Sequence, residues 1–523
     1  MASTDVVIVG AGHNGLVCAA YLARAGHEVV VVEQRPDIGG CTRTIDFPGA
    51  PGYRVNTCAD VDIFFHPTGI ADELGLRDFG WKLLRRDVEY FAPFADGSSV
   101  FIWPDVEATA REIARFSPAD ARGWRDYMAW WGEAFRRLDP IETAAPPRPA
   151  ELGEALGGDA WADEFLRFLV APPETAVSAF FESPQMQGIV AWQSSMYGAR
   201  PDLPGTTLGF GHLAGCVLNG IARPRGGTGA LPAALRACIE HHGGRVIVGN
   251  GAREVVVKGD RARAVALKDG TTIEARTAVV SAIDVKRLFG DLVAPGTLPP
   301  EDEDAVEEVT VNDIGLLRVS LALSEMPWFD ERYGLTEERA RQAMRSSIML
   351  DADSWEHVCA TWRAVETGEL SDPANSTWIG IPTAMDESLA PAGAHVISFA
   401  EYVPFELAHG DWESRREEAL EHVVSSWCRY APRTREAIVA SWVQTPADLH
   451  RETGNLNGNA FHIDHGFHQM FGMRPTPRMA QYRSPVDGLY LSGAGTHPGG
   501  GITGLPGRNA AHALLADLGE GGS

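Results

Sequence analysis

The segment Asp5-Val-Val-Ile-Val-Gly10-Ala-Gly12-His-Asn-Gly15 joins a short β-branched run to a glycine-rich turn. Residues 16–25, rich in alanine and leucine, follow with a helical pattern. Gly10 suits a tight turn, Gly12 lets the backbone approach a pyrophosphate, and Gly15 lets the helix pack closely on the strand. The segment therefore predicts a strand over 5–9, a helix over 16–25 and a phosphate at the helix N-terminus.

A second β-branched run over residues 28–32 comes after Gly26, and Glu33 stands at its carboxyl end. An acid in this place accepts hydrogen bonds from an adenosine ribose. A glycine turn alone is weak evidence of function. Strand, turn, helix, second strand and acid in this order predict a dinucleotide-binding Rossmann fold.

The amino-acid composition limits the classes of molecule that the protein is expected to bind. The chain has 523 residues, 45% of them hydrophobic, and a formal net charge of -25. An acidic surface repels nucleic acid and anionic membranes, so we expect no nucleic-acid partner and favour a small-molecule substrate. No apolar run is long enough to span a bilayer, and the start of the chain lacks the features of a signal peptide.

The seven cysteines include no CxxC pair, which argues against a disulfide framework and a zinc site. We therefore expect the cysteines to be reduced and the protein to be cytoplasmic. The number of subunits stays open, a homo-oligomer included.

Residues 60–220 carry helical patterns and many aromatic side chains. Ser117-Pro118 is a good helix start. The aromatic positions of that helix predict core packing more than a cavity lining; they are Trp124, Tyr127, Trp130, Trp131 and Phe135. Residues 139–151 contain four prolines and predict an exposed loop.

Near the carboxyl end, residues 488–504 form a strand followed by a glycine-dense turn, and a helix is expected over 505–518. A glycine run before a helix offers free N–H groups at a positive dipole end. Such an arrangement would stabilise negative charge on a bound group.

Three stretches carry a family resemblance: Glu33-Gln34-Arg35 with Gly39-Gly40-Cys41-Thr42-Arg43-Thr44, the string of residues 488–504, and Arg508-Asn509-Ala510-Ala511. They resemble the phytoene desaturase and amine oxidase superfamily, in its phytoene-dehydrogenase-like branch. The resemblance implies an α/β fold: a glutathione-reductase-type FAD-binding Rossmann domain interleaved with an α+β substrate domain. The FAD-binding domain would comprise residues 1–65, 221–290 and 480–523, and the substrate-binding domain residues 66–220 and 291–479.

The same resemblance implies FAD as the cofactor and assigns residues to it. Gly39 and Gly40 would approach the pyrophosphate and ribityl chain, as would Gly493, Ala494 and Gly495. The backbone around Val255 would meet the adenine, and Ile502 with Thr503 would present N–H groups to the pyrimidine edge. The full predicted set is Gly10, Gly12, Asn14, Gly15, Glu33, Gln34, Arg35, Gly39, Gly40, Thr42, Arg43, Val255, Gly493, Ala494, Gly495, Ile502 and Thr503.

In such an enzyme the flavin N5 accepts a hydride, and the protein supplies position and electrostatics. We expect one imidazole, His462 or His497, to act as a proton acceptor, because histidine titrates near neutral pH. No metal is expected. Amine oxidases of the superfamily commonly place a lysine near N5, and none of the four lysines, Lys82, Lys258, Lys268 and Lys286, is a clear counterpart.

The sequence thus favours an FAD-dependent dehydrogenase or desaturase acting on a small apolar substrate. Three alternatives stay open: a flavin amine oxidase that produces peroxide, a redox-neutral flavin isomerase, and a non-catalytic binding protein similar to the Rab GDP-dissociation inhibitors.

Overall fold

The predicted strand, turn and helix lie at the centre of the first sheet. The computed structural model describes residues 2–372, 374 and 376–520. In it β1 (Ala2–Val9) lies between β2 (Val29–Val32) and β12 (Thr272–Ser281) and is parallel to both. A Cβ at Gly15 would lie 2.2 Å from the carbonyl oxygen of Gly10. Only glycine therefore allows α1 (His13–Arg24) to pack this closely on the turn.

The strands of the first sheet run in the order β10-β11-β12-β1-β2-β9, and β18 pairs with β12. The remaining strands are β9 (Arg245–Ile247), β10 (Ala252–Lys258), β11 (Arg261–Leu267) and β18 (Leu489–Leu491). Val6 and Ile8 pack on one face against α1, α10 (Ala230–His241) and α18 (Leu505–Asp517). Alternate residues Val7 and Val9 pack on the other face, toward α11 (Val285–Arg287) and α12 (Pro300–Glu307). The sheet is thus covered on both faces.

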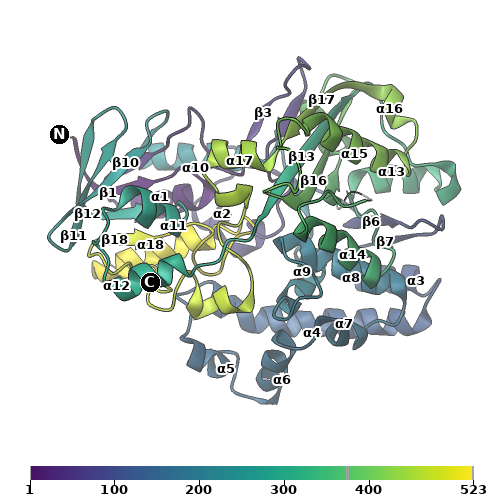
Figure 1. Cartoon of the computed structure of the whole chain (residues 1–523), viewed down its shortest axis with the longest axis horizontal. Coiled ribbons are helices and arrows are strands. Elements are labelled where there is room, and N and C mark those ends of the chain that lie inside the picture. The colour runs from purple at the N-terminus through teal and green to yellow at the C-terminus, as the bar shows by residue number, and fades with distance from the viewer. Residues whose placement is uncertain (1, 373, 375, 521–523) are drawn as a thin grey trace.

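The second sheet runs in the order β17-β13-β16-β15-β14-β6-β7. Its strands are β6 (Tyr90–Pro93), β7 (Ser99–Ile102), β13 (Ile314–Leu323), β14 (Ser347–Ile348), β15 (Ser376–Gly380), β16 (His395–Pro404) and β17 (Ile438–Gln444). Helices α13 (Glu337–Arg345) and α15 (Arg416–Cys428) contribute to the core on one side of it. Figure 1 shows the first sheet with α1 and α18 at the left and the second sheet with α15 at the right.

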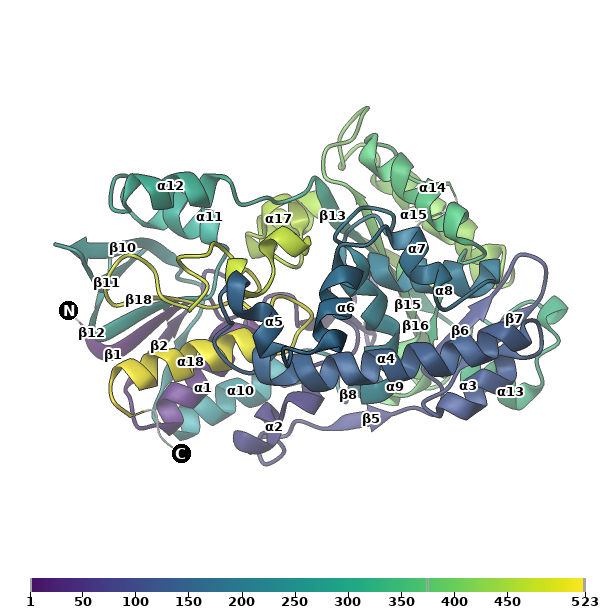
Figure 2. The same cartoon turned by 90° about the horizontal axis from the view of Figure 1, so that it is seen from below.

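A layer of helices lies beside the second sheet and shares a large core with it. It consists of α3 (Val106–Ile113), α4 (Pro118–Glu142), α5 (Leu152–Ala155), α6 (Ala160–Leu169), α7 (Pro173–Ser178), α8 (Pro184–Ser194), α9 (Gly211–Asn219) and α14 (Trp355–Glu366). Helix α4 begins as predicted, with the Ser117 hydroxyl accepting from the Asp120 N–H at 3.0 Å. Figure 2 shows α4 running from α3 toward α18.

The exposed loop predicted from residue 139 is wrong over its first four residues. Helix α4 continues through Pro140 and ends at Glu142. Pro140 lies in the last turn, where the missing N–H affects one carbonyl near the end of the helix and does not break it. Within α4, the side chains of Trp124, Tyr127 and Trp131 are buried in the core.

Short elements connect these layers. They are β3 (Thr44–Asp46), β4 (Arg54–Asn56), β5 (Leu83–Arg85), β8 (Ala222–Pro224), α2 (Ile70–Glu73), α16 (Thr434–Ala437) and α17 (Pro446–Thr453), with short turns of other helix types between them. The strands of the first sheet come from residues 2–32, 245–281 and 489–491, which supports the discontinuous two-domain division that we propose. In the part of the chain that the structure describes, no helix is both long and apolar enough to cross a membrane.

Candidate active site

A first cavity of about 310 Å³ opens where several strands of the first sheet end. Gly10 and Gly12 follow β1, Glu33 follows β2, Ala282 follows β12, and Gly493 comes after β18. The carboxyl ends of parallel strands meet at one sheet edge, which is the usual ligand position in such folds. One cavity thus brings together segments from the beginning, the middle and the end of the chain.

The turn at Gly12 is built to receive an anion. Helix α1 has Gly12 as its N-cap and no side chain caps it, so N–H groups of its first turn face the turn unbonded. A Cβ at Gly12 would meet no protein atom within 4 Å, although Gly12 lines the cavity. Gly40 lies beside it, and its own Cβ would come 3.3 Å from the Gly12 Cα. The empty space over Gly12 fits a pyrophosphate.

Four buried polar atoms of the cavity lining have no hydrogen-bond partner within the described residues: His13 Nε2, Asn14 Oδ1, Asp284 Oδ2 and His462 Nδ1. Buried polar atoms are normally hydrogen-bonded. Atoms left without partners around a cavity therefore fit a polar ligand such as a dinucleotide.

Glu33 stands at the other end of this cavity. Its carboxylate accepts hydrogen bonds from the N–H groups of Ala11, at 2.9 Å, and Arg35, at 3.0 Å. Gln34, Arg253 and Lys268 line the same end. Glu33 thus ties the glycine turn to the end of β2, in the place where the fold puts the adenosine ribose.

The predicted cofactor residues divide into three groups. Those that line the first cavity are Gly10, Gly12, Asn14, Glu33, Gln34, Arg35, Gly40, Gly493 and Ala494, together with His462. Thr503 lines a second cavity. The residues that line neither are Gly15, Gly39, Thr42, Arg43, Val255, Gly495, Ile502 and His497.

Three residues of the third group have other contacts: Thr42 and Arg43 hold the segment after β2, and Val255 belongs to the core. Thr42 Oγ1 donates to the Gly39 carbonyl at 2.7 Å, and Arg43 pairs with Asp37 at 2.9 Å. Val255 is 1% exposed within the core, while its neighbours Gly251 and Ala252 line the cavity.

The second cavity, of about 240 Å³, lies between the last glycine turn and the helical layer. Pro498, Gly500 and Thr503 contribute from the turn. The opposite wall is largely apolar and aromatic; it includes Phe64, Phe135, Leu138, Tyr197, Leu208 and Met470. Gly209, Gly211 and His212 also belong to this wall.

Both histidines predicted as proton acceptors are neutral at pH 7; His497 is buried and His462 is half-buried. Burial, and then the charge of Arg474, lowers the pKa of His462 to about 4. Burial is also the main reason that the pKa of His497 is lowered to about 4. His497 Nε2 lies 2.9 Å from the Ile141 carbonyl oxygen and lines neither cavity. Imidazoles with such low pKa values are weak bases at neutral pH.

Arg474 organises the loop that carries His462. Its fully buried guanidinium donates to five backbone carbonyls, those of Phe461, Ile463, Asp464, Gln469 and Ala494. Burial lowers the pKa of Arg474 to about 9, so it stays charged at neutral pH. The loop over residues 461–470 is therefore fixed to the last glycine turn by one side chain.

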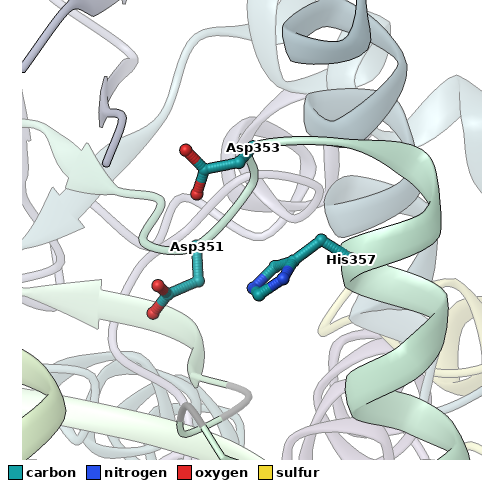
Figure 3. A group of neighbouring side chains, drawn as sticks. All are labelled: Asp351, Asp353 and His357. Atoms are coloured by element: carbon teal, nitrogen blue, oxygen red, sulfur yellow. The ribbon is translucent and has the colours of Figure 1, made fainter. Parts of the chain in front are cut away.

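A third group lies apart from both cavities. Figure 3 shows Asp351 and Asp353 in the loop before α14, with the His357 ring turned toward Asp351. The Asp351 carboxylate already pairs with Arg429 at 2.9 Å and accepts from Tyr430 Oη at 2.8 Å. Because its charge is compensated within the protein, we assign no metal to this group.

Sequence reasoning did not find most of the second cavity. Phe64, Glu142, Tyr197 and His465 lie far apart in the chain, and no local pattern connects them. The one available signal was the aromatic stripe of α4, whose last member, Phe135, lines the cavity.

Comparisons with known proteins agree with this arrangement. A family model described as "Flavin containing amine oxidoreductase" matches residues 15–515. The chain is 30% identical to the pyridine nucleotide-disulfide oxidoreductase domain-containing protein 2 of Mus musculus, over 98% of this chain and 94% of that protein. It is 26% identical to a limonene dehydrogenase subunit of Castellaniella defragrans, over 98% of this chain and 95% of that protein.

Among solved structures, wild-type putrescine oxidase bound to putrescine matches with a TM-score of 0.59 at 16% identity, over 99% of both chains. This likeness concerns the fold. The extent of the family match and the glycine segments of the first cavity lead to one assignment: the chain belongs to the flavin containing amine oxidoreductase family, whose cofactor is FAD.

Proposed function

We propose that the protein is an FAD-dependent dehydrogenase that removes a hydride from a small, largely apolar organic substrate. One observation carries the proposal: the turn over residues 493–503 contributes to both cavities, with Gly493 and Ala494 in the first and Gly500 and Thr503 in the second. A cofactor in the first cavity and a substrate in the second would meet at this turn.

Each part of the two cavities would have its own role in this reaction. Gly12 and the N-terminus of α1 would hold the pyrophosphate, and Glu33 the ribose. When bound, FAD supplies a hydride acceptor at N5. The N-terminus of α18, where Thr503 Oγ1 accepts from the Leu505 N–H at 3.1 Å, would favour negative charge nearby through the helix dipole. The apolar wall of the second cavity excludes water and selects an apolar substrate.

Two further points favour dehydrogenation over amine oxidation. Among the described residues that line the second cavity there is no lysine, whereas the amine oxidases of the superfamily commonly place one near N5. In addition, one relative is named as part of a limonene dehydrogenase, which indicates that this type of chain is compatible with an apolar substrate.

A flavin amine oxidase is the second candidate. The exposed Asp139 lies at the second cavity, and its negative charge would attract a cationic amine.

Anaerobic mixing of the FAD-loaded protein with panels of apolar alkenes, amides and amines tests the proposal through loss of the visible flavin absorbance. We expect alkenes or related apolar compounds to reduce the flavin. Reduction by amines alone, with stoichiometric peroxide in air, would establish the amine oxidase instead. A protein that retains no flavin would overturn both.

A further inference from the structure

Two carboxylates without a partner among the described residues line the second cavity, the exposed Asp139 and the half-buried Glu142. Glu142 is the last residue of α4. Among the described residues, no cation pairs with the Glu142 carboxylate and no donor hydrogen-bonds to it. Glu133 of the same helix, in contrast, pairs with Arg136 and Arg137. Keeping an unpaired carboxylate charged beside an apolar wall costs free energy.

Hydrogen bonds fix the backbone around Glu142 to the cofactor side of the molecule. Asn509 Nδ2 donates to the Glu142 carbonyl at 2.9 Å, and Arg508 Nη1 donates to the Thr143 carbonyl at 3.1 Å. His497 Nε2 lies 2.9 Å from the Ile141 carbonyl oxygen. Three consecutive carbonyls of the helix end are thus tied to the last glycine turn and to α18. Glu142 is therefore held at a defined place beside Gly500 and Thr503.

The groups that face Glu142 across the cavity do not compensate its charge. His212 of α9 has a pKa lowered to about 3 by burial, and burial lowers the pKa of His465 well below its usual value. Burial raises the pKa of Tyr197. All three are neutral near pH 7. Arg508, the nearby cation, is paired with Glu73 at 3.2 Å.

These surroundings raise the pKa of the Glu142 carboxyl group. Burial, and next the negative charge of Asp139 one helical turn earlier, raises the pKa of Glu142 to about 7. An acid–base catalyst works best when its pKa lies near the working pH, because both protonation states are then accessible. The sequence offered no such sign, since Glu142 fell within a predicted loop.

We propose that Glu142 is the catalytic proton acceptor of the second cavity, and that the substrate carries hydrogen on two adjacent carbons and leaves as an alkene. The inference rests on the dehydrogenase function proposed above. One carbon gives up its hydrogen with both bonding electrons to FAD. The neighbouring carbon gives its hydrogen as a proton to a Glu142 Oε, and that C–H electron pair becomes the new π bond.

The first test compares Glu142→Gln with the wild type, both loaded with FAD, in anaerobic single-turnover reduction by the alkene-forming substrate found in the panel. In the wild type the rate should rise with pH through about 7, as Glu142 loses its proton. Glu142→Gln should be about 100- to 10,000-fold slower and lose this pH dependence. Asp126→Asn, on an exposed position of the same helix, should behave as the wild type.

Asp139→Asn gives a second variant that keeps the acid. Removing the Asp139 charge should move the midpoint of the pH profile downward without abolishing reduction, because that charge helps to raise the Glu142 pKa. Equal rates and pH profiles for Glu142→Gln and the wild type would overturn the proposal. So would a reaction product without a new C=C bond.

A measurement without turnover separates this inference from the proposed function. In the FAD-loaded protein, infrared spectroscopy should show a protonated carboxyl band that titrates near pH 7 and is missing in Glu142→Gln, with a parallel change in the visible flavin spectrum. A missing titration refutes the role of Glu142 even if substrates reduce the flavin. A normal titration with no reduction by any compound refutes the dehydrogenase function and, with it, the catalytic role.

Discussion

Replacing Gly12 by valine should separate cofactor binding from folding. Gly12 has φ −67° and ψ 165°, a conformation that valine adopts readily, and its Cβ would meet no protein atom within 4 Å. The fold should therefore lose less than about 0.5 kcal/mol of stability, as for a surface substitution. The added carbons would instead occupy the space that fits the pyrophosphate.

The expected loss of affinity follows from the contacts blocked. A hydrogen bond from a backbone N–H to a charged group contributes about 1.5–3 kcal/mol. Losing one or two of them at the start of α1 should cost about 3 kcal/mol, which corresponds to a roughly 100-fold weaker Kd for FAD. Titration of the apoprotein with FAD, followed by fluorescence quenching, measures this Kd, and circular dichroism gives the Tm.

Two other glycines provide the controls. Gly132 of α4 has free space for a Cβ and lies away from both cavities, so Gly132→Ala should keep the Kd and slightly raise the Tm. Gly15→Ala should instead lower the Tm strongly, because its Cβ would lie 2.2 Å from the Gly10 carbonyl oxygen. If Gly12→Val binds FAD as tightly as the wild type, the assignment of this turn to the pyrophosphate is wrong.

Arg474→Leu should lower the free energy of unfolding by about 3 kcal/mol, because five backbone carbonyls lose their hydrogen-bond donor. Urea titration measures this loss, and a value below about 1 kcal/mol would contradict the prediction. Burial raises the pKa of Asp284 to about 6; between about pH 4 and 6 the folded state holds a proton that the unfolded state has lost, so stability falls as pH rises. In the cofactor-free protein this pH-dependent change in stability should amount to about 3 kcal/mol, and it should be missing in Asp284→Asn. If the wild type and Asp284→Asn lose stability equally over this pH range, Asp284 is not the group responsible. His462→Gln should change the rate of flavin reduction less than about tenfold, whereas a 100-fold loss would restore His462 as the proton acceptor.

The strand ends that border the first cavity could be predicted from the sequence, because they lie in short segments whose backbone conformation is restricted. Gly10, Gly12 and Glu33 follow strands whose order alone determines where they meet. Val255 shows the limit of this reasoning: the correct strand was found, but which of its residues faces the cavity depends on register.

The second cavity could not be predicted in the same way. Its walls come from segments that meet only after the helical layer has packed against the glycine turn. The sequence prediction put Glu142 in a loop, because the four prolines after residue 139 indicated a loop although the residues before them have a helical pattern. Cys41 and Cys58 are a similar case: no short motif joins them, yet the two thiols interact, which lowers the pKa of Cys41 and raises that of Cys58.

The bonds that join the end of α4 to α18 and the last glycine turn also couple two binding events. FAD bound against the turn would hold His497 and, through it, the Ile141 carbonyl at the wall of the second cavity. If FAD binding strengthens substrate binding in this way, then by thermodynamic reciprocity a compound in the second cavity strengthens FAD binding by the same factor.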